Sequence, residues 1–138
     1  MEYRVFAKRI DPQGSIATTK SAEIKLDTAL AGRPDAFNPA ELLIAALAAC
    51  MIKGIERVTP MINFELQGVE VRLHAVRQDS PPKILSIDYE LIVNTEESDQ
   101  RLDLLHRNVR KYGTISNTLS ECTQLNGRIR RSLCPQVP

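Results

Sequence analysis

The longest apolar run of the sequence extends from Leu42 to Ile52 and contains no charged residue. Asn38 stands shortly before it and is a favoured helix N-cap, followed by a proline that suits the first helical position. The carboxylate of Glu41 can reach back to the N-cap amide. These signals predict a helix over residues 38–59 that stops before Pro60.

This predicted helix has no polar face between Leu42 and Ile52. A helix that is apolar all round must be covered all round. In a small domain one sheet covers only one side, so the other side needs more helices or a second chain. We favour a second chain.

Alternation of apolar and polar residues with period two marks the strands. Residues 3–10 and 15–26 are strand-like, and residues 11–14, Asp-Pro-Gln-Gly, form a turn between them. Residues 69–75 and 87–93 alternate apolar with charged side chains. Since the segment between these two is turn-like, they predict an antiparallel hairpin with one polar face.

The last third of the sequence predicts two helices and a strand. Thr95 can cap a second helix, which Gly113 ends. The apolar stripe of this helix has helical spacing and consists of Leu102, Leu105, Val109 and Tyr112. A short third helix over residues 114–121 and a turn at Asn126-Gly127 precede a final strand over residues 128–133.

This order of elements predicts an α+β fold in a single domain over residues 1–138. Residues 1–37 supply N-terminal strands and a loop, and residues 38–59 supply the central helix. Residues 62–138 supply the hairpin, the other helices and the final strand.

The composition is that of an ordinary globular protein, with 43% apolar and 25% charged residues. A formal net charge of +1 and few aromatic residues argue against nucleic acid as a partner. The longest apolar run is too short to span a membrane, and the charged N-terminus has no signal-peptide core. We therefore expect a cytoplasmic protein with no nucleic-acid or membrane partner.

The three cysteines form no CxxC pair, which fits a reducing cytoplasm and predicts neither a disulfide framework nor a structural zinc site. His74 is expected to be exposed, and His106 is expected on the polar or flanking surface of the second helix. Neither histidine has a cysteine or carboxylate at ligand spacing, so we predict no metal and no cofactor.

Two stretches of the sequence together resemble one family. The stretch Asn38-Pro39-Ala40-Glu41-Leu42-Leu43, followed by Ala48-Ala49-Cys50, is similar to the NPEEL…AAC helix of the OsmC/Ohr superfamily, the osmotically inducible and organic hydroperoxide resistance proteins. The stretch Gly113-Thr114-Ile115-Ser116-Asn117-Thr118-Leu119 is similar to the second block of that family, CPVSNTL. The order of predicted elements is similar as well, so the resemblance covers nearly the whole chain.

The resemblance implies an OsmC-like fold, in which antiparallel sheets from both chains of an intertwined homodimer wrap around the long central apolar helices. It also implies a cysteine-based peroxidase of oxidative stress, with peroxiredoxin-like activity on organic hydroperoxides. In such enzymes the first cysteine attacks the peroxide and becomes a sulfenic acid, and the second condenses with it to a disulfide that a dithiol reduces. Cys50 occupies the position of the first cysteine.

A reactive Cys50 needs a cation beside its sulfur. Only about 3% of a free cysteine is ionised at pH 7, and burial makes ionisation harder. The start of its own helix lies about three turns away, beyond the reach of the helix dipole. The resemblance assigns the cation to an arginine of the first strand hairpin. Arg9 is the nearest match, Arg33 in the loop before the helix is the second candidate, and Lys53 and Arg57 follow along the helix.

Ala40 departs from the family pattern, because the family has a glutamate there that holds the arginine. Glu41 cannot replace it, since it points to the opposite side of the helix from Cys50. We expect this clamp to be absent or rebuilt from other residues, with Asp35 of the loop as a candidate.

Gly113 is the second departure, because the family has its second cysteine there. Cys122 lies nine residues further on and would need a rearrangement to reach Cys50, and Cys134 lies in the predicted C-terminal tail. We therefore predict a divergent member with a one-cysteine route, in which an external thiol reductant resolves the oxidised Cys50.

Three interpretations of Cys50 stay open. The first is a thiol-dependent hydroperoxide reductase whose apolar substrate enters a pocket at the dimer interface, lined by residues such as Leu43, Leu47 and Met51. The second is a catalytically degenerate OsmC-fold protein, in which Cys50 is a small buried hydrophobe and the pocket binds an apolar small molecule. The third is a different thiol reaction such as acyl transfer, for which the sequence shows no cysteine–histidine pairing.

Overall fold

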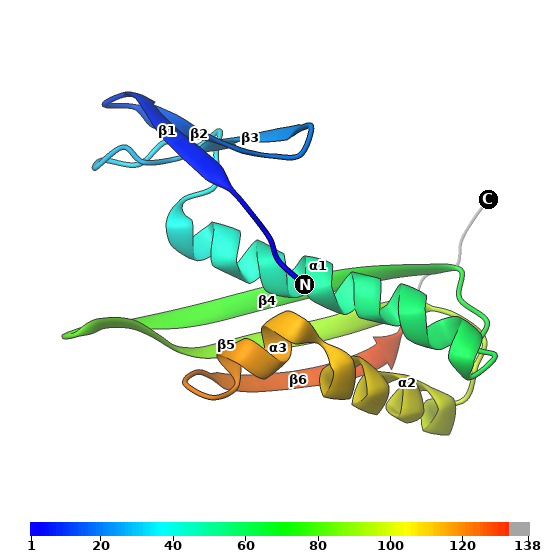
Figure 1. Cartoon of the computed structure of the whole chain (residues 1–138). Helices are drawn as coiled ribbons and strands as arrows, with labels where there is room; N and C mark the ends of the chain where they lie inside the picture. The colour runs from blue at the N-terminus through cyan, green and yellow to red at the C-terminus, as the bar shows by residue number, and fades with distance from the viewer. Residues whose placement is uncertain (133–138) are drawn as a thin grey trace. The chain divides into compact units, whose positions relative to one another are not determined.

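Two compact units, Met1–Ala45 and Ala46–Pro138, divide the chain in the computed structural model, which describes residues 1–132 (Figure 1). Each unit contains its own three-stranded sheet, and the fold is of the predicted α+β class. The structure defines each unit internally and does not fix the placement of one against the other. The single domain over residues 1–138 stays a prediction, and Cys134 lies outside the described residues.

The sheet of the first unit is antiparallel in the order β1-β2-β3, with β1 (Phe6–Asp11), β2 (Gly14–Thr19) and β3 (Ala22–Leu26). The predicted turn between the first two strands is confirmed, but the strand predicted over residues 15–26 is divided in two. Lys20 has a φ of 54°, in the left-handed region, and it reverses the chain between β2 and β3. Strand-forming residues stand on both sides of this turn, so periodicity alone does not reveal it.

Apolar side chains of the first unit are largely exposed. The large exposed ones are Met1, Tyr3, Val5, Phe6, Ile10, Ile24, Leu30, Phe37 and Leu43. The buried side chains of this unit are polar: Ser15, whose hydroxyl lies 2.7 Å from the Thr28 hydroxyl, and Asp27. Among its described residues the first unit therefore has no apolar core of its own.

The long helix α1 (Pro39–Met61) begins as predicted. Oδ1 of Asn38 accepts a hydrogen bond from the Glu41 N–H at 2.8 Å, and the Asn38 N–H donates to Oε1 of Glu41 at 3.0 Å. This reciprocal pair is a capping box, which satisfies two backbone donors that the helix itself leaves free.

The predicted stop before Pro60 is wrong, because α1 continues through that residue. Pro60 lies in the last turn, where the loss of one backbone hydrogen bond disturbs little of the helix. Asn63 follows with a φ of 51°, and the Phe64 N–H donates to the carbonyl of Thr59 at 2.8 Å. A left-handed residue with this bond is a Schellman-type helix end, so the stop comes from Asn63 rather than from the proline.

Only one stripe of α1 is buried within the chain. Its members are Leu47, Met51, Ile55, Val58 and Thr59. Leu43 and Ile52 each keep 38% of their surface exposed, although both belong to the all-apolar run. The chain thus covers one side of the helix that the sequence predicts to need cover on all sides.

The sheet of the second unit has the order β4-β5-β6, with β4 (Gly68–Asp79), β5 (Pro82–Asn94) and β6 (Gln124–Arg131). β4 and β5 form the predicted antiparallel hairpin and are longer than predicted. The inward face of β5 is apolar and buried, with Ile87, Tyr89, Leu91 and Val93. β6 is parallel to β5, so the segment between them is a crossover connection.

The predicted turn at Asn126-Gly127 is wrong, because both residues lie inside β6. Gly127 pairs with Tyr89 on β5, and a Cβ at this position would overlap the Tyr89 ring. This glycine therefore makes room for an aromatic ring on the neighbouring strand instead of turning the chain.

Two helices, α2 (Asp99–Tyr112) and α3 (Thr114–Leu119), form the crossover from β5 to β6 (Figure 1). The N-cap of α2 is Ser98, whose hydroxyl accepts from the Arg101 N–H at 3.3 Å, and not Thr95 as predicted. Thr95 instead donates to the carbonyl of Glu65 at 2.5 Å, which ties the start of β4 to the end of β5. Thr95 and Ser98 are both cap-type residues, and the tertiary contact of Thr95 leaves Ser98 as the cap.

The predicted apolar stripe of α2 is confirmed for Leu102, Leu105 and Val109, which are buried. Tyr112 is 47% exposed and does not belong to it. Gly113 ends the helix as predicted. Within residues 1–132 no helix is both long and apolar enough to cross a membrane.

Candidate functional site

Cys50 lies on α1 in the second unit, directly before the buried Met51, and it is half-buried. Its thiol is free. Lys53 and Arg57, the two cations further along the helix, are exposed and form no ion pair within the described residues. They point to solvent as the polar end of α1.

The sulfur of Cys50 contacts the start of α3. The Ile115 N–H donates to Sγ of Cys50 at an N···S distance of 3.4 Å. A Cβ on Gly113 would lie 3.4 Å from the same sulfur. Tertiary packing thus brings the two blocks that carried the sequence resemblance side by side, with Gly113 next to Cys50.

Ser116 occupies the space beside Gly113. It is only 2% exposed, and its hydroxyl donates to the Gly113 carbonyl at 3.2 Å. A Cβ on Gly113 would overlap this hydroxyl and would lie 3.1 Å from the carbonyl oxygen of Val109. Any larger residue at position 113 therefore requires Ser116 to move. Ser116 is not evident as a site residue from the sequence, where its only signal is its place in the second block.

A backbone N–H directed at a cysteine sulfur is a donor that does not titrate. The Ile115 N–H is available to a negatively charged Cys50 sulfur or to an oxygen bonded to that sulfur. Cys122, by contrast, is exposed, and its sulfur lies 3.7 Å from both the Leu119 carbonyl and the Thr123 hydroxyl. Both contacts are with residues close to Cys122 in the chain, so its sulfur is held within the turn after α3.

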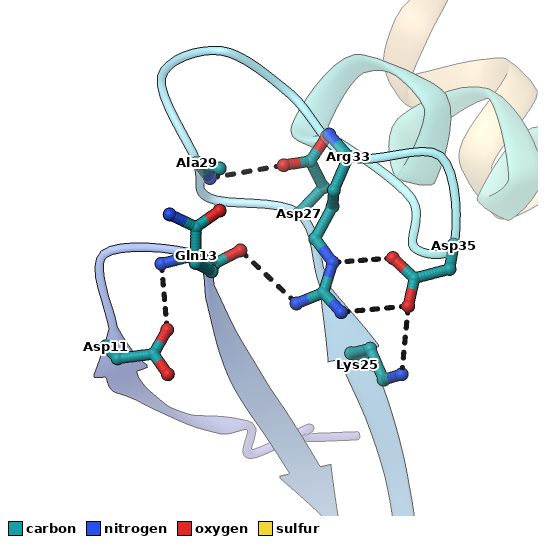
Figure 2. Close-up of polar contacts among 7 residues, drawn as sticks. All are labelled: Asp11, Gln13, Lys25, Asp27, Ala29, Arg33 and Asp35. Atoms are coloured by element: carbon teal, nitrogen blue, oxygen red, sulfur yellow. Dashed lines mark hydrogen bonds and ion pairs between the residues drawn. The ribbon is translucent and has the colours of Figure 1, made fainter.

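Arg33 lies in the first unit, and its guanidinium is fixed by three hydrogen bonds (Figure 2). Nε and Nη2 donate to the two carboxylate oxygens of Asp35 at 2.6 and 2.8 Å, a bidentate pair. Nη1 donates to the carbonyl of Gln13 at 3.3 Å. Lys25 lies 3.4 Å from the same carboxylate. Asp35, the residue named from the sequence as a candidate to hold an arginine, is thus paired with Arg33.

The backbone of the loop is shaped to place Arg33. The buried carboxylate of Asp27 accepts from the Ala29 N–H at 3.1 Å and from the Arg33 N–H at 3.0 Å. Gly32 has a φ of 81°, which favours glycine. A Cβ on Gly14 would lie 2.6 Å from Nη1 of Arg33, so the predicted turn of the first hairpin also makes room for this guanidinium.

Charge pairing keeps both members of this pair ionised. Hydrogen bonds from Arg33 hold the pKa of the Asp35 carboxyl well below its usual range, against the opposing effect of burial. The same bonds raise the pKa of the Arg33 guanidinium. Arg33 is thus a permanent and positioned cation at neutral pH.

Arg9 lies on β1 opposite Ser15 and is exposed. It forms no hydrogen bond from its side chain and no ion pair within residues 1–132. Both arginines belong to the first unit and Cys50 belongs to the second, so the pairing of either guanidinium with the Cys50 sulfur stays a prediction. No group of three or more His, Cys, Asp or Glu side chains in the described part of the chain could hold a metal ion.

A profile of the family described as OsmC-like protein matches residues 32–126. Among solved structures, the OsmC-like protein of Mycoplasma pneumoniae is 18% identical, with coverage of 96% of this chain and 98% of that chain and a TM-score of 0.86. No curated protein sequence matches the chain.

Two further solved structures carry names that mention hydroperoxide resistance. The organic hydroperoxide resistance protein OsmC of Legionella pneumophila is 21% identical, covers 95% of this chain and 98% of its own, and has a TM-score of 0.72. The organic hydroperoxide resistance protein OhrB of Bacillus subtilis is 19% identical, with coverage of 94% and 98% and a TM-score of 0.67. At these identities the likeness establishes the fold.

Proposed function

Because the chain belongs to the family of OsmC-like proteins, we propose that it reduces organic hydroperoxides with Cys50 as its redox cysteine. Structural relatives named for organic hydroperoxide resistance support this reaction class. The observation that carries the proposal is the 3.4 Å hydrogen bond from the Ile115 N–H to the Cys50 sulfur, next to Gly113. It directs a fixed donor at the atom that would react.

The proposed route uses one protein sulfur. The Cys50 thiolate attacks the terminal oxygen of the hydroperoxide, the O–O bond breaks, and the leaving alkoxide takes a proton to become an alcohol. Cys50 is then a sulfenic acid. An external thiol condenses with it, which releases water and forms a mixed disulfide, and a second external thiol restores Cys50 as the two external sulfurs join in a disulfide. A reducing cytoplasm would supply these thiols.

Arg33 is the cation that we assign to the Cys50 sulfur in this reaction, and Asp35 is the residue that positions it. The bidentate pair between them supports this assignment, because it fixes the guanidinium, which is the task expected of the glutamate that is missing at Ala40. Arg9, the other candidate, has no such fixing contact within the described residues. Asp35→Asn should therefore lower the rate of Cys50 oxidation about tenfold, the scale of one lost charge-assisted hydrogen bond.

The matched control for this assignment is Asp79→Asn, because Asp79 forms an ion pair with Arg77 at the same two-residue spacing in the second unit. It should leave the rate unchanged. An equal loss in both variants, or no loss in Asp35→Asn, would remove Arg33 from the site.

A homodimer is part of the proposal. The exposed apolar side chains of the first unit and the uncovered side of α1, with Leu43 and Ile52, support it, because they leave apolar surface that one chain does not bury. In the dimer this surface would be buried and would line a pocket for an apolar hydroperoxide.

The experiment detects oxidation of the Cys50 sulfur by hydroperoxide. Treatment with cumene hydroperoxide should give a sulfenic acid on Cys50, trapped by dimedone and located by mass spectrometry. Cys50→Ser should abolish thiol-dependent hydroperoxide consumption, and Cys122→Ser should retain it. Unmodified Cys50 and persistent hydroperoxide at catalytic protein concentrations would refute the enzyme.

The alternative is a binding protein with the same fold and no catalysis, and Gly113 favours it, because no second sulfur stands beside Cys50 at this position. It predicts that an apolar ligand protects Cys50 from alkylation while hydroperoxide leaves the sulfur unchanged. The dimedone experiment separates the two functions.

A further inference from the structure

A hollow on α2 is lined by basic side chains and lies apart from the Cys50 sulfur contact. Its volume is about 380 Å³, and its lining residues are His106, Arg107, Arg110 and Lys111. His106 and Arg110 are one helical turn apart, as are Arg107 and Lys111, so the four side chains lie on one side of α2. No acidic side chain of the described residues belongs to the lining.

Five of the other arginines of the second unit form ion pairs, namely Arg77, Arg101, Arg128, Arg130 and Arg131. The remaining two, Arg57 and Arg72, are exposed and form none within residues 1–132. Within residues 1–132, Arg107, Arg110 and Lys111 form none. The nearest acidic residue on the helix, Asp103, accepts from Nε of Arg107 only through its backbone carbonyl, at 3.4 Å. Three permanent charges are therefore left without a neutralising partner in the part of the chain that the structure describes.

A buried phenol holds two of the four lining residues in place. Tyr89 is 3% exposed, and its hydroxyl lies 2.6 Å from Nε2 of His106 and accepts from Nη1 of Arg110 at 3.0 Å. The Arg110 guanidinium also lies over the Tyr89 ring, 5.7 Å from its centroid. The ring has this position because Gly127 leaves room for it.

The Tyr89 hydroxyl joins Arg110 and His106 in one hydrogen-bonded group. Arginine can only donate, so the Tyr89 oxygen accepts from Arg110. The contact between this hydroxyl and Nε2 of His106 has the phenol or the ring as its donor, according to the tautomer of the ring. Burial, and next the Arg110 charge, lower the pKa of His106, which favours a neutral ring. The positive charge of the hollow therefore comes from Arg107, Arg110 and Lys111.

The three positive charges of the hollow favour a phosphate group over a carboxylate as the bound anion. A carboxylate is planar, carries one charge and is satisfied by a single guanidinium. A phosphate group carries up to two charges, and its three terminal oxygens accept donors from several directions. The hollow is larger than a bare anion needs, and a nucleic-acid backbone would need a longer row of cations. Compensation of the helix dipole explains cations in the last turn of α2, but not their orientation by Tyr89.

We propose that the hollow formed by His106, Arg107, Arg110 and Lys111 binds the phosphate group of a small organic phosphate monoester. Arg107, Arg110 and Lys111 supply the charge, His106 completes the lining, and Tyr89 positions His106 and Arg110. This site is independent of Cys50, so Cys50→Ser should bind the same ligand unchanged.

Histidine ring signals in NMR spectra test this site, because the sequence has only two histidines. Inorganic phosphate, titrated against chloride at constant ionic strength, should shift the His106 signal to saturation. His74, exposed on β4, should not shift. Phenyl phosphate should bind more tightly than inorganic phosphate, and benzoate more weakly than both. A non-saturating shift, an equal shift of both histidines, or benzoate binding as tight as phosphate would overturn the proposal.

Charge-removing variants test the same site from the protein side. Arg107→Gln and Lys111→Gln should each weaken phosphate binding about tenfold, the scale of one hydrogen bond to a charged group. Lys83→Gln, which removes an equal charge at the start of β5, is the control and should bind normally. Tyr89→Phe keeps the ring over Gly127 and should weaken binding by releasing Arg110 and His106. Equal weakening in Lys83→Gln, or full binding in the double variant Arg107→Gln/Lys111→Gln, would overturn the assignment.

Discussion

The two units of the chain differ in the burial of their apolar side chains. In the second unit the apolar faces of α1, α2 and β5 bury one another, and every buried apolar side chain of the described residues lies there. In the first unit the strands form from turns and backbone hydrogen bonds alone, and Phe6, Ile10 and Ile24 remain exposed. Strands can thus form without a core, but apolar side chains of this size usually find cover.

This difference shows where each unit obtains its stability. The second unit has the packed core that stabilises a domain on its own. The first unit relies on polar contacts, such as Asp27 with the loop amides and Arg33 with Asp35. Its exposed apolar residues are the part of the chain for which the proposed dimer supplies cover.

Removal of core volume should have the largest effect, and only in the second unit. Leu91 is fully buried on β5, so Leu91→Ala should lower the free energy of unfolding by about 2–5 kcal/mol. Leu30 is fully exposed in the first unit, and Leu30→Ala should change the free energy of unfolding by less than about 0.5 kcal/mol. Urea denaturation of both variants measures the difference. Equal losses would show that the first unit packs as tightly as the second.

A charge on the sheet of the first unit should weaken the dimer more than it affects the folded chain. Phe6→Asp places a carboxylate in the surface that we propose to be covered, and it should raise the dimer dissociation constant about tenfold or more. Light scattering over a dilution series measures this constant. Val76→Asp makes the same change at an exposed apolar residue of β4 in the second unit and serves as the control. A wild-type chain that scatters as a folded monomer would contradict the dimer outright.

A cysteine introduced at position 113 tests whether Cys50 in the second unit is the residue that hydroperoxide oxidises. Gly113→Cys alone should be hindered by Ser116, whereas Gly113→Cys combined with Ser116→Gly has the required space. In the double variant, hydroperoxide should produce a cross-link between Cys50 and the introduced cysteine, since a Cβ at position 113 lies 3.4 Å from the Cys50 sulfur. Mass spectrometry after blocking of free thiols detects it. A double variant that folds, is oxidised at Cys50 and forms no cross-link would show that the introduced cysteine does not reach the oxidised sulfur.

The smallest expected effect is the loss of stability at low pH from the Arg33–Asp35 pair in the loop of the first unit. The pKa of Asp35 is held below its usual range in the folded chain, so the pair with Arg33 stabilises the loop fully above the unfolded value of about 3.9. This contribution is lost as the pH falls through the lower folded pKa. It should be small, because both side chains are partly exposed. A carboxyl NMR titration of Asp35 with a midpoint near 3.9 would contradict the pairing.

Local signals predicted most elements and failed where two of them competed. The capping box at Asn38, the β4–β5 hairpin and the buried stripe of α2 were all predicted, because each depends on residues close in sequence. The helix end at Asn63 and the cap at Ser98 were not, since Pro60 and Thr95 are equally good signals in isolation.

Sequence alone determined the fold class and the family, and it singled out Cys50 as the candidate redox cysteine, because short motifs and periodicity are properties of neighbouring residues. It also named Asp35 as a candidate to hold the arginine, and the structure pairs Asp35 with Arg33, two residues away. Only the tertiary structure placed the Ile115 amide on the Cys50 sulfur and the Tyr89 hydroxyl between His106 and Arg110. Such contacts join residues far apart in the chain, and packing sets their distances.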